Sequence, residues 1–196
     1  MIPIKPKPEP SDFAKLVRKP GNSFLSITPH PTAQEWEKRD YWRKALPAMS
    51  VSYKRICAYC AHWIPHSTGT HSIDHFIPKS IKPSLAYEWT NFRYVSSRFN
   101  SRKGVKTILD PFELQEGWVT LDLASFLLKP NRDLLSEQKQ QVSDTIEILK
   151  LNSDDKLVQE RQGWIEDFLS GQYTFAFLSE KAPFIASELL RQGYLQ

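Results

Sequence analysis

Residues 72–104 leave few folds open, because two short strand-like segments are followed by a short helix-like segment. The segments SIDHFI (72–77) and FRYVSS (92–97) have the length and apolar content of strands. The segment SRFNSRKG (97–104) predicts a helix that ends at Gly104. With 196 residues, the chain is long enough for a real hydrophobic core and fits one domain, or a compact site with a helical appendage.

The N-terminal part of the chain predicts an extended segment followed by helices. Residues 1–31 are rich in proline and are expected to be extended. Thr32 and Glu35 have the spacing of a capping box, which predicts a helix over residues 33–46 that ends near Pro47. The segment SVSYKR after it is expected to form a second, short helix.

The C-terminal third predicts a strand and then several helices. Residues 119–123 (VTLDL) have the character of a strand, and beyond them apolar residues recur at helical spacing. We expect one helix over residues 135–149, another over 153–171 and a last one over 183–193. The second of these begins with a serine and two aspartates, which favour a helix N-terminus.

Basic residues gather around the strand–strand–helix segment. The formal net charge of +4 is weak evidence by itself. Between residues 75 and 109, however, seven lysines and arginines stand against one acidic residue, Glu88. A phosphate-binding surface requires such a local excess, although a solvated basic face is the alternative.

No segment has the features of a secretion signal or a membrane span. The N-terminus, MIPIKPKPEP, has no apolar core, and no run of about 18 apolar residues occurs. Two cysteines, Cys57 and Cys60, are too few for a disulfide scaffold. We therefore expect a cytoplasmic protein that has no membrane partner.

Four chemically distinctive elements follow one another in the centre of the chain. They are CAYC at 57–60, DHFIPKS at 74–80, Asn91 within EWTNFRYVSS, and Asn100 within RFNSRKG. An Asp–His pair alone is more often a surface carboxylate beside a part-buried histidine. Together with two asparagines and a basic helix, it resembles the motif of the HNH endonucleases.

The resemblance covers about residues 55–105 and implies a ββα-metal unit that holds one divalent ion. The expected fold class is α+β, a mostly helical chain around a small HNH core. We expect an N-terminal extended arm and helix in residues 1–54, the nuclease core in 55–105, and a helical region packed on the core in 106–196.

The resemblance also implies roles for four residues. Asp74 and Asn100 match the metal-ligand positions of the motif, and their oxygen atoms suit Mg²⁺ or Mn²⁺. His75 would be the general base that takes a proton from water near neutral pH. Asn91 would hold the loop between the strands and so aim His75, without direct chemistry. The activated water would attack phosphorus in line, and the ion would neutralise the charge that develops.

Four basic side chains near the motif are expected to contact a nucleic-acid backbone: Lys79, Arg98, Arg102 and Lys103. Asn100 and Lys103 are three residues apart on the expected helix and share a face. No base-reading motif accompanies them, and phosphate contacts do not specify sequence. We therefore expect little sequence specificity. Three alternatives stay open: whether the substrate is DNA or RNA, whether it is single- or double-stranded, and whether the enzyme nicks one strand or cuts both.

The cysteine pair departs from the pattern of many HNH proteins, which have a second pair just before the last asparagine. Here that stretch is VSSRFN, so a four-cysteine zinc site within one chain is impossible. A mixed site that uses Cys57 and Cys60 with His62, His66 or His71 is the alternative, at unusual spacing. We expect no structural zinc and interpret the cysteines as small buried hydrophobic residues.

A narrower resemblance comes from three longer segments, PEPSDFAKLVRKPG, LAYEWTNFRYVSSRFNSRKG and ILDPFEL. They look like stand-alone bacterial HNH proteins, some of which act in anti-phage systems such as Septu or retron-associated modules beside an ATPase subunit. The expected function is a metal-dependent DNA endonuclease of phage defence. The alternatives are an HNH fold that binds nucleic acid or a partner without cutting, and a nuclease that is silent until it joins an ATPase subunit. A homo-oligomer stays open.

Overall fold

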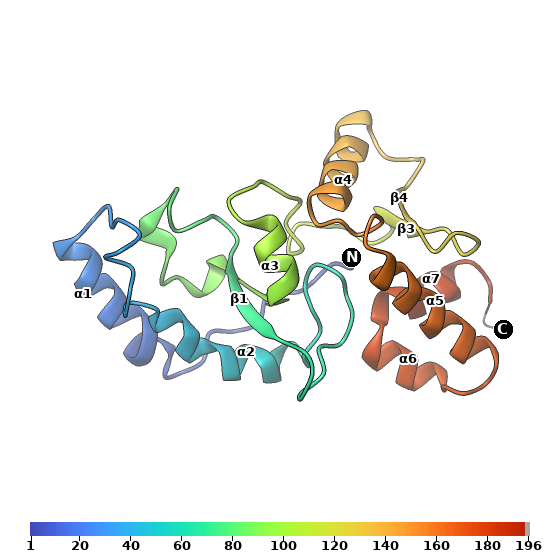
Figure 1. Ribbon diagram of the computed structural model, residues 1–196, viewed down its shortest axis with the longest axis horizontal. Helices are drawn as coiled ribbons and strands as arrows, with labels where there is room; N and C mark the ends of the chain where they lie inside the picture. The colour runs from blue at the N-terminus through green and yellow to red at the C-terminus, as the bar shows by residue number, and fades with distance from the viewer. Residues whose placement is uncertain (195–196) are drawn as a thin grey trace. The chain divides into compact units, whose positions relative to one another are not determined.

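The computed structural model describes residues 1–194 and has an α+β fold, which confirms the expected class (Figure 1). The chain forms two compact units. The central unit consists of residues 5–55 and 64–105, and the C-terminal unit of residues 1–4, 56–63 and 106 onward. All residues of the expected nuclease site lie in the central unit, whereas the cysteine pair lies in the C-terminal unit. The three-part division drawn from the sequence stays a prediction.

The central unit contains the predicted strand–strand–helix arrangement. Strands β1 and β2 pair antiparallel, and α3 follows β2 without a break and lies beside β1 (Figure 1). Gly104 ends α3 with a positive φ of 53°, as predicted. The elements of this unit, in chain order, are the π-helical turn η1 (Ala14–Arg18), α1 (Lys19–Ile27), the 3-10 helix η2 (Tyr41–Ala45), α2 (Leu46–Ser52), β1 (His71–His75), the 3-10 helices η3 (Pro83–Leu85) and η4 (Trp89–Asn91), β2 (Phe92–Ser96) and α3 (Ser97–Lys103).

The C-terminal unit is a two-stranded hairpin with four helices. Its elements are β3 (Val119–Leu121), β4 (Leu128–Pro130), α4 (Ser136–Ile148), α5 (Asp155–Leu169), α6 (Phe175–Lys181) and α7 (Pro183–Arg191). The predicted strand and the three predicted helices are all present, and Asp154 caps α5 by accepting a hydrogen bond from the Leu157 amide. Helix α6 was not predicted. It packs with α5 and α7 around buried Leu178 and Leu189 (Figure 1).

The expectation of an extended N-terminus was wrong for residues 14–27, which are helical. Proline content was a poor guide here, because the one proline of this segment, Pro20, stands in the first turn of α1. A proline is tolerated there, since the first turn needs no amide donor. Val17 is buried, so the helical segment contributes to the core of the central unit.

The continuous helix predicted over residues 33–46 does not form: residues 33–38 form turns, and the 3-10 helix η2 covers Tyr41–Ala45. The capping bonds between Thr32 and Glu35 do form, with 2.7 Å from the Thr32 amide to the Glu35 carboxylate. Turns follow instead of a helix, and Lys38 has a positive φ of 60°, which an α-helix does not allow. Pro47 lies in the first turn of α2 and therefore begins a helix where the sequence predicted an end.

Packing of aromatic rings explains why this segment turns. The Trp36 and Trp42 rings both lie against the ring of buried Tyr87, with centroids 6.2 Å and 5.9 Å away. The two tryptophan rings also contact each other at 6.1 Å. Aromatic burial of this size outweighs the local preference for a helix, which is worth only tenths of a kcal/mol per residue.

The close approach of α1 to Tyr87 depends on Gly21. A Cβ atom at Gly21 would lie 2.1 Å from the Tyr87 ring. We expect Gly21→Ala to lower the free energy of unfolding by about 1–3 kcal/mol through overpacking, measured by chemical denaturation. The matched control is Gly163→Ala in α5, where nothing lies within 4 Å of the new Cβ. That substitution should stabilise by about 0.5–1 kcal/mol. Equal effects of the two substitutions would contradict this packing.

Candidate active site

The strand–strand–helix unit brings together the residues that the sequence singled out. In the antiparallel register, Asp74 of β1 is opposite Arg93 of β2, and His75 is opposite Phe92. The side chain of Asn100, one turn into α3, reaches back to β1. Its Nδ2 donates to the Ser72 hydroxyl at 3.1 Å and to the Ile73 carbonyl at 3.2 Å. Asn100 is thereby held next to the backbone that leads into Asp74.

Asp74 is buried and forms an ion pair with Lys103. The Lys103 ammonium lies 3.2 Å from Oδ1 and 3.1 Å from Oδ2 of Asp74, and it also donates to the His75 carbonyl at 3.1 Å. The two side chains are 3% and 0% exposed. A buried carboxylate needs such compensation, because its charge has lost the solvation of water.

The position of Lys103 differs from the expectation that it contacts a phosphate. Its ammonium points into the protein at Asp74 and lies 5.6 Å from the centre of the Phe76 ring. The shared helix face of Asn100 and Lys103 was predicted, but this face is directed at β1. Burial of the lysine follows from that orientation.

His75 is held in one tautomer by the backbone. Its Nε2 lies 2.9 Å from the Ala86 carbonyl oxygen. A carbonyl only accepts, so Nε2 carries the hydrogen, and Nδ1 of the neutral ring keeps its lone pair. The ring packs edge-to-face against Trp42 at 4.8 Å and Phe92 at 5.3 Å. Burial among these rings lowers the pKa of His75 to about 4, so the imidazole is neutral at pH 7.

Asn91 ties together the loop that separates the two strands. Its Oδ1 accepts from the Ile77 amide at 2.8 Å, and its Nδ2 donates to the carbonyls of Ile77 at 3.0 Å and Leu85 at 3.1 Å. Leu85 precedes Ala86, whose carbonyl fixes the His75 ring. Asn91 therefore supports the loop that carries the acceptor of His75, and its positioning role in catalysis stays a prediction.

The other basic residues of the prediction have different surroundings. The Lys79 ammonium lies over the rings of Trp36 and Trp42, 4.3 Å and 5.4 Å from their centroids, and desolvation lowers its pKa. Arg98 is exposed on α3, and the Arg102 guanidinium lies 5.3 Å from the centre of the Phe99 ring. Arg98 and Arg102 thus lie on α3 near Asn100, and Lys79 lies near His75.

Sequence reasoning missed two residues that surround the site. Trp42 packs directly on His75, and Arg93, which is 4% exposed, donates to the carbonyls of Thr90 and Phe92. The central unit brings Trp42 to His75 from a distant part of the chain, so no local pattern announced it. Arg93 was counted among the surface basic residues, although its position opposite Asp74 follows from the strand register.

The cysteine pair lies in a tight turn of the C-terminal unit. The Cys57 amide donates to the His62 carbonyl at 2.9 Å, and Cys57 is buried. Burial raises the pKa of the Cys60 thiol well above its usual value. His62 is 3% exposed, and its Nδ1 lies 3.2 Å from a Glu160 carboxylate oxygen, whereas His71 bonds the Tyr94 hydroxyl at 2.7 Å. Among residues 1–194, no three His, Cys, Asp or Glu side chains are grouped to hold a metal ion.

The fold and the site define an α+β protein with a strand–strand–helix unit, in which a buried Asp–Lys pair adjoins an oriented neutral histidine. No protein-family model matches the chain. The chain is similar to the Septu protein PtuB of Bacillus thuringiensis, with 28% identity over 131 residues. The match covers 64% of this chain and 46% of the length of PtuB. It supports the Septu-type resemblance, whereas the HNH assignment depends on the residues of the site.

A helix that crosses a membrane must be long and apolar. Within residues 1–194, no helix has both the length and the apolar character that are needed to cross a bilayer.

Proposed function

We propose that the protein is a metal-dependent endonuclease that hydrolyses phosphodiester bonds in DNA. The observation that carries this proposal is the neutral His75, whose Nδ1 is unprotonated because the Ala86 carbonyl holds the hydrogen on Nε2. Among the described residues, no group donates to this Nδ1. A neutral imidazole that is held in one orientation, with a ring nitrogen able to accept a proton, is what general-base hydrolysis requires.

The residues around Asp74 fit a divalent ion. Asp74 and Asn100 would hold it, because a carboxylate and an amide oxygen are the donors that Mg²⁺ and Mn²⁺ prefer, and Mg²⁺ keeps several waters. The amide nitrogen of Asn100 is already occupied by Ser72 and Ile73, which leaves its Oδ1 for a ligand. When bound, the ion would neutralise negative charge on the phosphate and on the leaving oxygen.

The chain's own residues account for the remaining steps. His75 accepts a proton at Nδ1 from the attacking water and becomes an imidazolium, which the Ala86 carbonyl continues to orient through Nε2–H. A phosphate bound beside His75 favours this cation, since an opposite charge raises the pKa of an imidazole. Arg98 and Arg102, next to Asn100 on α3, are suited to hold the flanking phosphates.

One observation favours a second candidate, an HNH fold that binds nucleic acid or a partner without cutting. Both carboxylate oxygens of Asp74 lie within 3.2 Å of the Lys103 ammonium. A site that never takes up a metal ion would keep such an ion pair, which satisfies the carboxylate by itself. The intact His75 and Asn91 arrangement supports the nuclease more strongly, because binding alone needs neither.

Similarity to Septu PtuB supports a role in bacterial anti-phage defence. We infer that the protein works as the nuclease subunit of a defence complex, beside an ATPase partner. The proposal concerns the whole chain, although the match spans less than half of the relative.

Cleavage of supercoiled plasmid DNA tests the proposed function, with the protein alone and with a candidate ATPase partner added. We expect nicking with Mn²⁺ or Mg²⁺ and none in EDTA, because the phosphate charge is then not neutralised. Binding without cleavage under every metal and partner condition would leave the non-cutting candidate. Plaque assays with cells that express the protein together with this partner test the defence role.

A further inference from the structure

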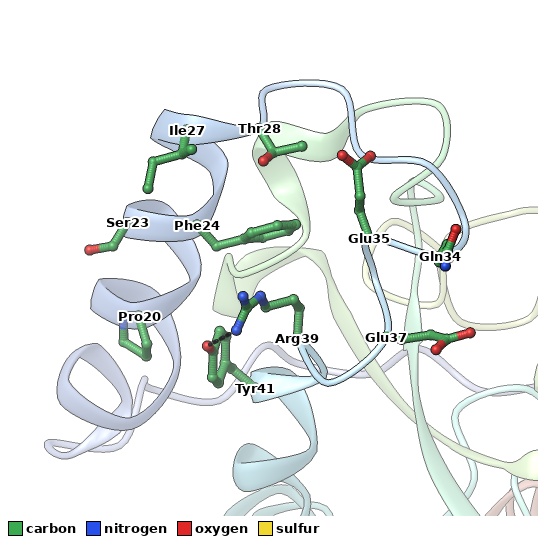
Figure 2. Close-up of a pocket in the computed structure, with 10 residues that line it drawn as sticks. All are labelled: Pro20, Ser23, Phe24, Ile27, Thr28, Gln34, Glu35, Glu37, Arg39 and Tyr41. Carbon is green, nitrogen blue, oxygen red and sulfur yellow. Dashed lines mark hydrogen bonds between the residues drawn. The ribbon is translucent and has the colours of Figure 1, made fainter.

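A cleft of about 640 Å³ opens in the central unit beside α1 (Figure 2). One wall is formed by α1, which contributes Pro20, Phe24 and Ile27. The opposite wall is the segment after α1, which contributes polar side chains that include Glu35 and Arg39. The volume is within the range of about 300–1,000 Å³ that small-molecule sites have. The nuclease residues do not line this cleft, so the proposed reaction leaves it unexplained.

The cleft combines a stacking surface with charges that lack partners. The Arg39 guanidinium lies 5.3 Å from the centre of the Phe24 ring, and its Nη1 donates to the Tyr41 hydroxyl at 3.4 Å (Figure 2). No carboxylate of the described residues pairs with Arg39. On the same wall, the Glu37 carboxylate is exposed and meets no cation of residues 1–194. Glu35 stays ionised, since hydrogen bonds from Thr32 lower its pKa.

Packed aromatic rings connect the cleft to the candidate active site. Phe24 packs edge-to-face on Trp36, with ring centroids 5.6 Å apart. Trp36 contacts Trp42 at 6.1 Å, and Trp42 contacts His75 at 4.8 Å. The Lys79 ammonium lies over the two tryptophan rings, between the cleft and His75.

We propose that this cleft binds the base of an unpaired nucleotide in the strand that is cut, an inference that rests on the proposed function. The base stacks on Phe24 and the guanidinium of Arg39, as bases do in proteins that bind single strands. Its phosphate lies towards the Lys79 ammonium, which is held over the Trp36 and Trp42 rings. A base inside a duplex is covered by its neighbours, so only an unpaired or displaced base enters.

The charges of the cleft also define which base fits. A carboxylate only accepts hydrogen bonds, so Glu35, which lies beside Thr28 at the edge of the cleft, favours a base that has an exocyclic amino group (Figure 2). Cytosine, adenine and guanine have this group, and thymine and uracil lack it. A lysine-rich peptide would also satisfy the carboxylates, but it would leave the Phe24 ring and the Arg39 guanidinium unused. The observations therefore favour a nucleotide over a cationic peptide.

The test measures binding of labelled 12-nucleotide strands in EDTA, where the strand stays intact. We expect the wild-type protein to bind oligo-dC and oligo-dA more tightly than oligo-dT, and each more tightly than a duplex of the same length. Phe24→Ala and Arg39→Gln should each weaken binding of oligo-dC by about 5- to 150-fold, as expected for loss of one stacked base. The matched controls are Phe177→Ala and Arg43→Gln, which lie outside the cleft and should bind like the wild type.

A third variant keeps the inference testable if Phe24→Ala fails to fold. Glu35 is exposed, and glutamine keeps an oxygen that accepts from Thr32, so Glu35→Gln should leave the fold intact and remove part of the preference for oligo-dC over oligo-dT. Oligo-rC in place of oligo-dC shows whether the unpaired strand is RNA or DNA. Equal binding of oligo-dC by all cleft variants and the wild type overturns the inference.

The two proposals fail in distinguishable ways. If the protein cuts DNA but the cleft variants bind oligo-dC like the wild type, only the inference about the cleft is overturned. Cleft-dependent binding by a protein that never cuts overturns the nuclease proposal, and leaves a single-strand-binding module with the same cleft.

Discussion

His75→Ala is expected to lower the rate of metal-dependent DNA cleavage by about 10²–10⁴-fold, the usual contribution of a general base. The substitution removes the Nδ1 lone pair that takes the proton of the attacking water, while Asp74, Asn100 and Lys103 stay in place. DNA affinity measured in EDTA should change little, since the ring is packed against Trp42 and Phe92. Nicking of supercoiled plasmid in Mn²⁺, followed over time, measures the effect.

The matched control is His71→Ala, at the other end of the same strand. The His71 ring bonds the Tyr94 hydroxyl at 2.7 Å and is unrelated to the Ala86 carbonyl. We expect this variant to cut at close to the wild-type rate. Equal losses in the two variants would mean that β1 had been disturbed in both, and equal cleavage by His75→Ala and wild type would remove His75 from the mechanism.

The dependence of kcat/KM on pH gives a second check on His75. Because its pKa is lowered to about 4, the base stays unprotonated well below the usual histidine value. The parameter kcat/KM reports groups of the free enzyme. On the acid side, kcat/KM should therefore decline near pH 4. The ordinary pKa of an imidazole, about 6.5, would instead place this decline near neutral pH. An acid limb near pH 6.5 would mean that His75 is solvated in the active protein.

The sequence predicted the order of elements around the site because each element is short and has a local signal. Strand β1 (His71–His75) overlaps the predicted segment 72–77, strand β2 (Phe92–Ser96) lies within the predicted segment 92–97, and Gly104 ends α3 because it adopts a positive φ. The same reasoning failed for the first part of residues 33–46, where the cap bonds formed but turns followed. There the decisive contacts are with Tyr87, far along the chain, and a local pattern contains no information about them.

Positions of single side chains were harder to predict than the elements that present them. Helical spacing correctly gave Asn100 and Lys103 a shared face, but the face could point at solvent or at β1. The register of β1 and β2 decides this, since it buries Asp74 and requires a cation beside it. A lysine that seemed suited to phosphate is therefore paired within the protein.

The Asp74–Lys103 pair leads to the largest expected effect on stability. Lys103→Met should lower the free energy of unfolding by about 3–5 kcal/mol in EDTA, because the buried Asp74 carboxylate loses the ammonium that contacts both of its oxygens. Methionine retains much of the unbranched length of lysine, so packing contributes little to the loss. Urea denaturation followed by circular dichroism measures it. The matched control is Lys82→Met, which removes the same charge from an exposed side chain and should unfold close to wild type.

The same variant tests whether Asp74 is part of a cation site without any measurement of cleavage. Mn²⁺ should raise the melting temperature of Lys103→Met more than that of the wild type, because the ion no longer competes with the ammonium for the Asp74 oxygens. In the double variant Asp74→Asn/Lys103→Met, the loss of stability should be smaller than the sum of the single losses, and the Mn²⁺ effect should disappear. If Mn²⁺ stabilises the single and the double variant equally, Asp74 is not the ligand. The buried pair would then be purely structural, and the non-cutting candidate would become the better description of the site.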